Sequence, residues 1–428
     1  MKKVLVITYY WPPAGGPGVQ RWLKFVTYLE EFGITPVLYV PANAKYPLLD
    51  PTMIREVPSD ITIYKYNISE PLQWARGLFK KKAERISSGI ISESKPGWME
   101  SLLLWIRGNF FIPDARVLWV KPSVRFLEEK IASEEIDTLV TTGPPHSMHL
   151  IGLRLKERSG INWVADFRDP WTSIGYHDKL KLGPVARRKH KELEAAVLKG
   201  ADKVLVTSRT TKREFESITS RPVVVVTNGY EESAYSGQPV ALDDAFTITH
   251  TGSLLSGRNP EALWRALQEM VAENELFRKA FRLRLAGVVS HEVQASMDRH
   301  GLLPFLEEME YQTHDETVQL QRQSQVLLLI ETDSLETEGI LPGKLFEYLA
   351  AQRPVLAVGP GSWEAGAIIR ETGAGSVFDY DSGAGIRKQL LEWFELYSKG
   401  GLKTASRGIE KYGRRAITRQ LAKELVWE

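Results

Sequence analysis

The stretch ETEGILPGKLFEYLAA, residues 336–351, decides the fold class of this chain. Its Pro-Gly pair leads into a helical pattern, and a short apolar strand follows at 354–358. Lys344 and Glu347 are three residues apart and therefore share one face of that helix. A helix N-terminus with a lysine can hold phosphates, and a carboxylate one turn later can accept both hydroxyls of a ribose. The alternative is an exposed salt bridge between the two side chains.

The order of strand, helix and strand continues on both sides of this stretch. Short apolar runs such as 4–8 and 246–251 alternate with amphipathic helical patterns. Continuous apolar strands between helices are typical of parallel sheets covered on both faces. The pattern restarts after a polar stretch at 231–244, which predicts two α/β domains. We expect one domain at 1–240, completed by a helix at 406–428, and a second domain at 241–405.

Length and composition agree with two globular domains. The chain has 428 residues, of which 43% are hydrophobic and 25% are charged. It has 0 Cys, which excludes a thiolate nucleophile, a disulfide and a cysteine metal site. Lys and Arg number 55 against 53 Asp and Glu, a net charge of +2. This balance argues against a nucleic-acid binder.

No targeting segment is recognisable. The apolar start is interrupted by two tyrosines at 9–10, and no small-residue cleavage site follows. The longest apolar runs elsewhere, 102–106 and 326–330, are far shorter than the roughly 20 residues of a membrane span. We expect a cytoplasmic protein that is at most peripheral on the inner face of the plasma membrane.

The region 68–130 interrupts the alternation of strands and helices. It holds four tryptophans, and between 70 and 130 eleven basic residues stand against seven acidic ones. One interpretation is a helical insertion whose tryptophans lie in the core. The other is a basic and aromatic surface that contacts anionic lipid, with tryptophan at the interface. We favour membrane contact through 70–130.

Candidate site residues lie in the loops that follow strands, because ligands bind beyond the carboxyl ends of parallel strands. In WPPAGGPG, residues 11–18, glycines let backbone amides approach an anion, and Gly16 is the candidate. The third glycine of a dinucleotide fingerprint is missing, and the next strand ends without an acidic residue. A dehydrogenase is therefore disfavoured. The alternative is a tight turn alone.

Two further loops of the first domain carry polar candidates. In TTGPPHSMH, residues 141–149, His146 can face a cleft, and the lack of an acidic partner disfavours a metal site. In DFRDPW, residues 166–171, three charged residues end a buried strand, which is costly unless they are paired or functional. They either brace loops as an Asp–Arg pair or bind a substrate hydroxyl, with Asp169 preferred over Asp166 as a general base.

The loop TGSLLSGR, residues 251–258, follows the first strand of the second domain. Gly252 and Ser253 can present backbone amides, and Arg258 can reach a phosphate with its fork of donors. A surface loop without function is the alternative for this segment taken alone.

Together these motifs resemble a glycosyltransferase of the GT-B fold, and they are most similar to glycosyltransferase family 4. The resemblance rests on the Gly-rich first loop, the TGS loop with its downstream cation, the EG…P…E…A…P segment at 338–354 and the C-terminal helix. The stretch GPPHSMHL…WVADFRDPW is similar to a subgroup from bacterial surface polysaccharide clusters. The resemblance implies two facing Rossmann-like domains with parallel sheets and a last helix that crosses back to the first domain. It also implies retaining transfer without a metal or other cofactor.

By this resemblance Glu347 matches the glutamate that binds the ribose, Arg258 matches a lysine that holds the diphosphate, and Gly16 lies near the diphosphate and acceptor. The chain also departs from the family. Ser253 replaces a common arginine, for which Lys344 is a candidate substitute. The role of the first family glutamate falls to Glu338 or to the backbone amides at 340–343, which include that of Gly343. A common histidine is replaced by Arg168, with Asp169 beside it.

We therefore expect a retaining, metal-independent glycosyltransferase in cell-surface polysaccharide synthesis. The donor is a nucleoside-diphosphate sugar, with UDP favoured over GDP, and the acceptor is a glycan or a lipid-linked sugar. Asp169 and His146 are the candidate catalytic residues, and Asp166 and Arg168 are candidate acceptor contacts. The alternatives are a nucleotide-sugar epimerase or hydrolase of the same fold, and a non-catalytic nucleotide or sugar binder that scaffolds a membrane assembly.

Overall fold

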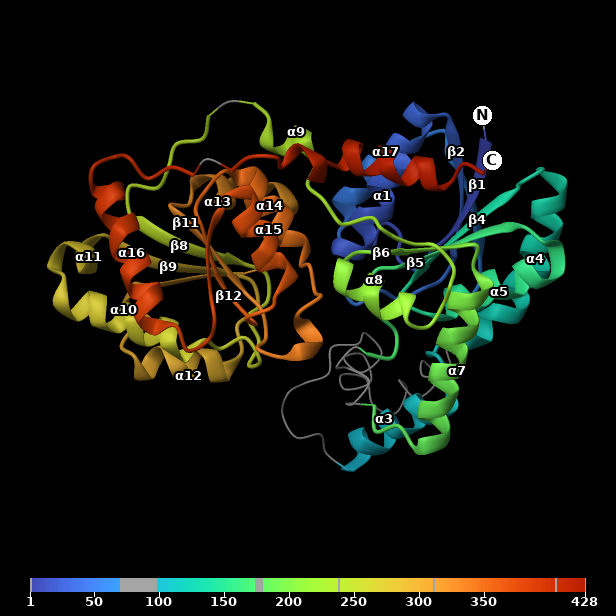
Figure 1. Cartoon of the computed structure of the whole chain (residues 1–428), viewed down its shortest axis with the longest axis horizontal. Helices are drawn as coiled ribbons and strands as arrows, with labels where there is room; N and C mark the ends of the chain where they lie inside the picture. The colour runs from blue at the N-terminus through green and yellow to red at the C-terminus, as the bar shows by residue number, and fades with distance from the viewer. Residues whose placement is uncertain are drawn as a thin grey trace. The chain divides into compact units, whose positions relative to one another are not determined.

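The computed structural model describes residues 2–69, 98–173, 180–237, 239–310, 312–404 and 406–427. The chain divides into two compact units, and Figure 1 shows both. Unit 1 comprises Met1–Thr227 and Arg415–Glu428, and unit 2 comprises Asn228–Arg414. The sequence placed the first boundary later, at 240, and the second earlier, at 406. The first boundary between the units comes before the polar stretch at 231–244, because Tyr230 and Tyr235 pack into an apolar cluster of unit 2.

Unit 1 contains a parallel sheet of seven strands in the order β3-β2-β1-β4-β5-β6-β7. The strand order reverses between β1 and β4, which pair in parallel. The strands are β1 Lys2–Ile7, β2 Ile34–Pro41, β3 Thr62–Tyr66, β4 Thr138–Gly143, β5 Asn162–Phe167, β6 Lys203–Val206 and β7 Val223–Val225.

Helices cover both faces of this sheet, because successive strand side chains point to opposite sides. In β1, Leu5 and Ile7 pack into the cluster beneath α4, α5, α7 and α8, whereas Val4 and Val6 pack against α1 and α17. The described helices of unit 1 are α1 Pro17–Leu29, α3 Trp98–Phe110, α4 Val117–Ser133, α5 Ser147–Ser159, α7 Pro184–Gly200, α8 Arg209–Glu216 and α17 Arg414–Glu424.

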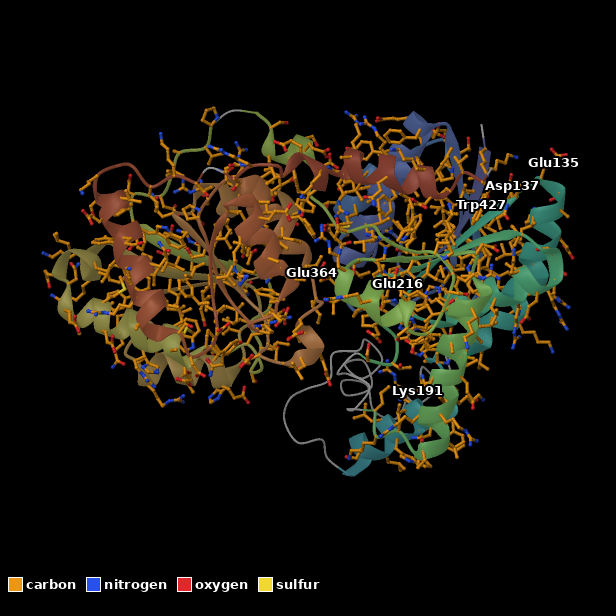
Figure 2. The ribbon with its side chains drawn as sticks, viewed as in Figure 1. Glu135, Asp137, Lys191, Glu216, Glu364 and Trp427 are labelled. Carbon is orange, nitrogen blue, oxygen red and sulfur yellow. The ribbon has the colours of Figure 1, made fainter. Side chains whose placement is uncertain are left out.

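The C-terminal helix α17 packs into unit 1, which confirms the expected return of the chain end to the first domain. Ile417, Leu421 and Leu425 belong to the same apolar cluster as Val4 and Val6. Beyond the helix, the Lys203 ammonium lies 4.6 Å from the ring centroid of Trp427, which Figure 2 labels. The last helix is therefore part of the core of unit 1.

Unit 2 contains a parallel sheet of six strands in the order β10-β9-β8-β11-β12-β13. Here the order reverses between β8 and β11, which pair in parallel. The strands are β8 Phe246–Thr251, β9 Phe281–Ala286, β10 Leu306–Met309, β11 Val326–Ile330, β12 Val355–Val358 and β13 Gly375–Phe378.

Two helical layers cover the sheet of unit 2. One apolar cluster joins it to α10, α12 and α16, and another joins it to α14 and α15. None of the helices within the described ranges has the length and apolar character to cross a bilayer. The described helices are α9 Glu232–Tyr235, α10 Glu261–Glu273, α11 Glu275–Ala280, α12 His291–Arg299, α13 His314–Gln323, α14 Gly343–Ala351, α15 Glu364–Thr372 and α16 Gly383–Ser398.

Candidate functional site

Unit 2 gathers polar residues at the point where its strand order reverses. In an open parallel sheet this point leaves a crevice beyond the carboxyl ends of the two central strands. Gly252 directly follows β8, and Glu331 directly follows β11. Helix α14 begins at Gly343, after an N-cap at Pro342. The three segments that the sequence analysis treated separately therefore meet at one end of the sheet.

Lys344 lies at the centre of this group. Its Nζ is 3.2 Å from His250 Nε2. A Cβ added to Gly252 would stand 3.0 Å from the same Nζ. Gly252 has a φ of +95°, a conformation that side-chain-bearing residues rarely adopt. The glycine thus lets the loop turn sharply and leaves space for the lysine.

The protonation states of this pair are fixed by their surroundings. His250 Nδ1 donates to the Leu328 carbonyl at 2.9 Å, so in the neutral ring Nε2 accepts from Lys344. Burial, together with the charge of Lys344, holds the pKa of His250 well below its usual value. Burial and the charge of Arg258 lower the pKa of Lys344 to about 8. An added anion would favour the charged lysine.

Arg258 is engaged by a buried carboxylate. Its Nε and Nη2 donate to Glu331 Oε1 at 3.0 and 2.9 Å, and the Glu331 side chain is only 1% exposed. No hydrogen bond of Arg258 Nη1 occurs among the described residues. The Tyr380 hydroxyl donates to the Glu331 carbonyl at 2.8 Å and so holds the segment beside the ion pair.

Glu347 lies one turn into α14 and is reached by a buried amide. Gln321 Nε2 donates to Glu347 Oε2 at 2.9 Å. The same Gln321 accepts from the Tyr235 hydroxyl at 2.6 Å. Nearby, the Thr251 backbone amide donates to the Tyr348 hydroxyl at 3.0 Å, which ties α14 to the end of β8.

The remaining residues expected to bind a donor have fewer contacts. Gly343 is the first residue of α14, and Ser253 follows Gly252 in the turn after β8. Glu338 ends a short 3₁₀ turn, and its carbonyl accepts from the Glu364 amide at 2.9 Å. No described contact joins the Glu338 carboxylate to Lys344, Arg258 or Glu347.

In unit 1, Arg168 ties together the loops that follow β1, β4 and β5. A Cβ on Gly18 would stand 1.8 Å from Arg168 Nη1, so the first turn of α1, directly after the loop that follows β1, fits over the guanidinium. Arg168 Nε donates to the Gly143 carbonyl at 3.3 Å, and Nη2 donates to the Pro144 carbonyl. Gly16 is the N-cap of α1 with a φ of +101°. These contacts make Arg168 a clamp between loops.

Asp166 is completely buried and accepts hydrogen bonds from three side chains. Its Oδ1 lies 2.8 Å from Arg21 Nη2, and its Oδ2 accepts from Trp22 and Thr142 at 2.7 and 2.8 Å. Burial alone would raise the pKa of Asp166, but Arg21 and these hydrogen bonds hold it below its usual value. This geometry favours the bracing interpretation over contact with an acceptor.

Asp169 has a different environment. No hydrogen bond reaches its carboxyl from the part of the chain that the structure describes. Burial raises the pKa of Asp169, and the neighbouring charge of Arg168 opposes that rise. Two residues on, the Trp171 amide donates to Glu194 of α7 at 3.2 Å, so the loop that carries Asp169 is anchored. Asp169 therefore keeps its hydrogen-bonding capacity on a fixed loop.

His146 packs in an aromatic stack below this loop. Its ring is parallel to Trp171, with 4.8 Å between centroids and a 1° angle between planes. The residue is 2% exposed, and burial lowers the pKa of the adjacent His149 to about 3. His149 Nδ1 is 2.9 Å from Thr141 Oγ1. This packing gives His146 a structural role in loop placement.

Several residues of these sites were not found from the sequence. Glu331 directly follows a strand, and the rule about strand ends could have identified it. His250 and Gln321 lie within a strand and a helix and gave no such signal.

Among the described residues, no three His, Asp or Glu side chains group as metal ligands would.

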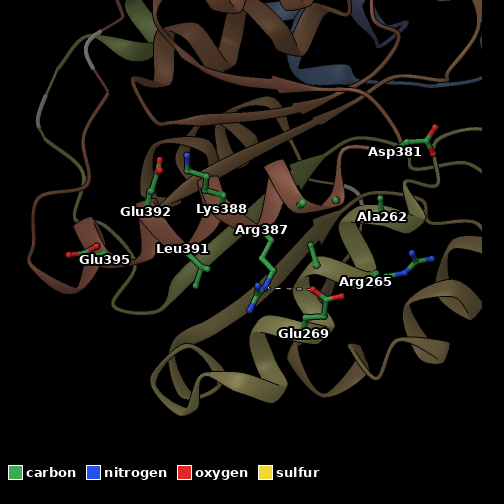
Figure 3. A pocket seen from close by; sticks show the side chains of 12 residues that line it. Ala262, Arg265, Glu269, Asp381, Arg387, Lys388, Leu391, Glu392 and Glu395 are labelled. Atoms are coloured by element: carbon green, nitrogen blue, oxygen red, sulfur yellow. Dashed lines mark ion pairs between the residues drawn. The ribbon is translucent and has the colours of Figure 1, made fainter.

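A separate groove of about 570 Å³ lies between α10 and α16, and Figure 3 shows it. Its Arg387 is already paired with Glu269, at 3.6 Å, and with Glu273. The remaining charges along the groove are mixed in sign. The groove therefore favours no class of ligand.

Comparison with known proteins gives a family match for part of the chain. Residues 90–233 match the model of Glycosyltransferase Family 4. The chain is a glycosyltransferase with the GT-B fold. A search of curated proteins finds no match.

Solved structures of GT-B proteins resemble the whole chain. Sucrose-phosphate synthase from Thermosynechococcus elongatus is 12% identical and has a TM-score of 0.61, with 99% of this chain and 98% of that chain covered. Anabaena Alr3699/HepE in complex with UDP-glucose is 12% identical at a TM-score of 0.61, with 99% of each chain covered. WaaG, a glycosyltransferase involved in lipopolysaccharide biosynthesis, is 12% identical at 0.52, covering 98% and 94%. The expected fold class is confirmed.

Proposed function

We propose that this glycosyltransferase moves a sugar, with retention and without a metal, from a nucleoside-diphosphate sugar to a glycan or lipid-linked acceptor. The observation that carries the proposal is the meeting of Lys344, Gly252 and Arg258 at the carboxyl end of the unit 2 sheet. We favour UDP over GDP as the nucleotide. The solved complex of HepE with UDP-glucose, a protein of the same fold, supports this class of donor.

Lys344 and Arg258 act on the leaving diphosphate in this proposal. As the bond to the sugar breaks, negative charge grows on the diphosphate, and prearranged cations stabilise that state more than the ground state. Lys344 lies in the first turn of α14, where the helix dipole adds to its charge. The Gly252 amide, expected from the sequence to face the anion, instead donates to the Ala286 carbonyl at 2.7 Å. The amides of Ser253 and Gly343 complete the anion site, and these groups do the work that a metal does in other transferases.

The pairing of Arg258 with Glu331 changes how its role is tested. Removal of the arginine alone would leave a buried carboxylate without its partner, which destabilises proteins strongly. A loss of activity in Arg258→Gln would then have two explanations. The double variant R258Q/E331Q removes both charges together, and a loss of donor affinity in it points to Arg258 itself.

The nucleoside and the acceptor are assigned to different units. Glu347 accepts the two ribose hydroxyls, and Glu338 or the backbone at 340–343 contacts the donor sugar. In unit 1, Asp169 receives the acceptor hydroxyl, because its carboxyl is anchored on a fixed loop and has its acceptor lone pairs available. Gly16 lies in the loop near the diphosphate of the donor and the acceptor, and His146, Asp166 and Arg168 hold these loops in place.

We also propose that the enzyme works in surface polysaccharide synthesis in a bacterial cytoplasm, as a peripheral protein on anionic membrane. Part of the expected contact region, 70–97, lies outside the described residues. The described support is a surface on α3 and α7 where Trp105, Phe110 and Val185 are 42%, 68% and 71% exposed. Arg187, Arg188 and Lys191 of α7 are exposed in the same part of unit 1, and Figure 2 labels Lys191. Exposed apolar and basic side chains together suit anionic lipid.

Vesicle sedimentation tests the membrane contact. The triple variant R187Q/R188Q/K191Q should lose binding to phosphatidylglycerol vesicles, whereas R265Q/K388Q/K399Q, with the same charge change on unit 2, should keep it. Equal binding of both variants would reject this surface.

A screen of nucleotide sugars followed by product analysis tests the function. The donor that raises the melting temperature most is incubated with membrane extract, because a bound ligand stabilises the folded state by mass action. We expect the sugar in a product with the anomeric configuration of the donor, equally with and without EDTA. Release or epimerisation of the sugar without acceptor would favour the hydrolase or epimerase. Binding without turnover would favour a scaffold.

A further inference from the structure

The amide of Gln321 is held by groups on three sides. The residue is in α13 and is 0% exposed, and both the nitrogen and the oxygen of its amide make hydrogen bonds. Nε2 donates to Glu347 Oε2 at 2.9 Å and to Thr251 Oγ1 at 3.4 Å, and Oε1 accepts from the Tyr235 hydroxyl at 2.6 Å. A buried polar network in which every member is satisfied is rigid.

The partners fix which way the amide faces. The Glu347 carboxylate can only accept when ionised, so the nitrogen of Gln321 must point toward it and the oxygen toward Tyr235. Burial raises the pKa of Tyr235 well above its usual value, and the charge of Glu347 raises it further. Tyr235 is therefore a neutral phenol that donates its proton to Gln321.

This arrangement determines which oxygen of the Glu347 carboxylate is available to a ligand. Gln321 is the hydrogen-bond partner of Oε2, and no hydrogen bond reaches Oε1 from the described ranges of the chain. A neutral donor holds the carboxylate without supplying a competing positive charge. Glu347 thus has one oxygen fixed and the other available for a ligand that carries hydroxyl donors.

We propose that Gln321 is a positioning residue that orients the Glu347 carboxylate toward the ribose of the donor. The inference rests on the proposed role of Glu347, and it adds the source of the preference for a ribonucleotide over a 2′-deoxyribonucleotide. Tyr235 extends the same chain of hydrogen bonds to α9, only a few residues after the chain enters unit 2 at Asn228. Gln321 touches no reacting atom and acts through Glu347 alone.

A purely structural role for Gln321 predicts a different pattern of binding. If the amide only fills space in the core, its loss weakens all nucleotides alike or lowers stability without changing selectivity. If it orients Glu347, its loss weakens ligands that have a 2′-hydroxyl more than those that lack it. The ratio of the two affinities therefore separates the roles.

The experiment measures the dissociation constants of UDP and 2′-deoxy-UDP by calorimetric titration of the full chain. The variants are Q321L, which has nearly the same volume, Y235F, which removes one oxygen, and E347Q. We expect the wild type to prefer UDP, and Q321L to bind UDP roughly threefold to tenfold more weakly while binding of 2′-deoxy-UDP changes little. Y235F should reduce the preference in the same direction by a smaller factor.

Two outcomes separate the role of Gln321 from the role of Glu347. An unchanged ratio in Q321L and Y235F, with a reduced ratio in E347Q, would overturn the role of Gln321 and keep the ribose contact. An unchanged ratio in E347Q would reject the proposed role of Glu347 itself. Thermal unfolding of each variant checks that it is folded, and if Q321L is not, Y235F decides the question.

Discussion

At the scale of single residues, Lys344 shows that a binding-site charge can be unfavourable for the stability of the folded protein. Its pKa is lowered to about 8 from the usual value of 10.5, first by burial and then by the charge of Arg258. Between these two values the unfolded chain binds more protons than the folded chain, so stability rises with pH across that window. At neutral pH the charged lysine is therefore unfavourable in the empty protein. A bound diphosphate would remove that cost.

The same shift predicts how donor binding depends on pH. Only the protonated lysine attracts a diphosphate, so the affinity for UDP should fall as pH rises through about 8. The nucleotide contributes little to this change, because a terminal phosphate ionises near pH 6, which is about two pH units below the pKa of Lys344. Titrations from pH 7 to 9 measure the effect, and Lys344→Arg, whose charge persists, serves as the control. A wild-type affinity that stays constant to pH 9 would show that Lys344 does not bind the anion.

At the scale of elements, Asp166 and Asp169 have different roles: Asp166 braces loops, whereas Asp169 is proposed to bind the acceptor. The Asp166 carboxylate joins β5 to α1 through Arg21 and Trp22 and to the end of β4 through Thr142. Asp166→Asn should destabilise the protein by about 3–5 kcal/mol, because the buried Arg21 loses its partner. Asp169→Asn is the matched variant and should change stability by less than about 1 kcal/mol while lowering use of the acceptor. Urea unfolding and initial rates measure the two effects, and equal destabilisation would contradict the division of roles.

The elements also show what the sequence could predict. The strands at 4–8, 138–142 and 246–251 were clear because all their residues except His250 are apolar or β-branched. The edge strand β3 was missed, since its residues are half exposed and mixed in character. Lys344 and Glu347 were found from their helical spacing. Gln321 was not, because its importance depends on contacts with residues 26 and 86 positions away in the chain.

At the scale of the whole molecule, all proposed donor residues except Gly16 lie in unit 2, a continuous segment from Asn228 to Arg414. Its two apolar clusters use only residues of that segment. A fragment of residues 228–414 should therefore unfold cooperatively and bind UDP within about threefold of the full chain, which corresponds to less than 1 kcal/mol. Circular dichroism and calorimetric titration test this. A folded fragment that does not bind UDP would place essential donor contacts in unit 1.

The central claim is that Lys344, beside Gly252 and Arg258, binds the diphosphate of the donor. Calorimetric titration of UDP at pH 7 into the wild type and Lys344→Met tests it most directly, with Lys388→Met on the surface of α16 as the control. We predict at least a tenfold loss of affinity in Lys344→Met, about 1.4 kcal/mol, and no change in the control. Equal affinity of the folded Lys344→Met variant and the wild type would contradict the account.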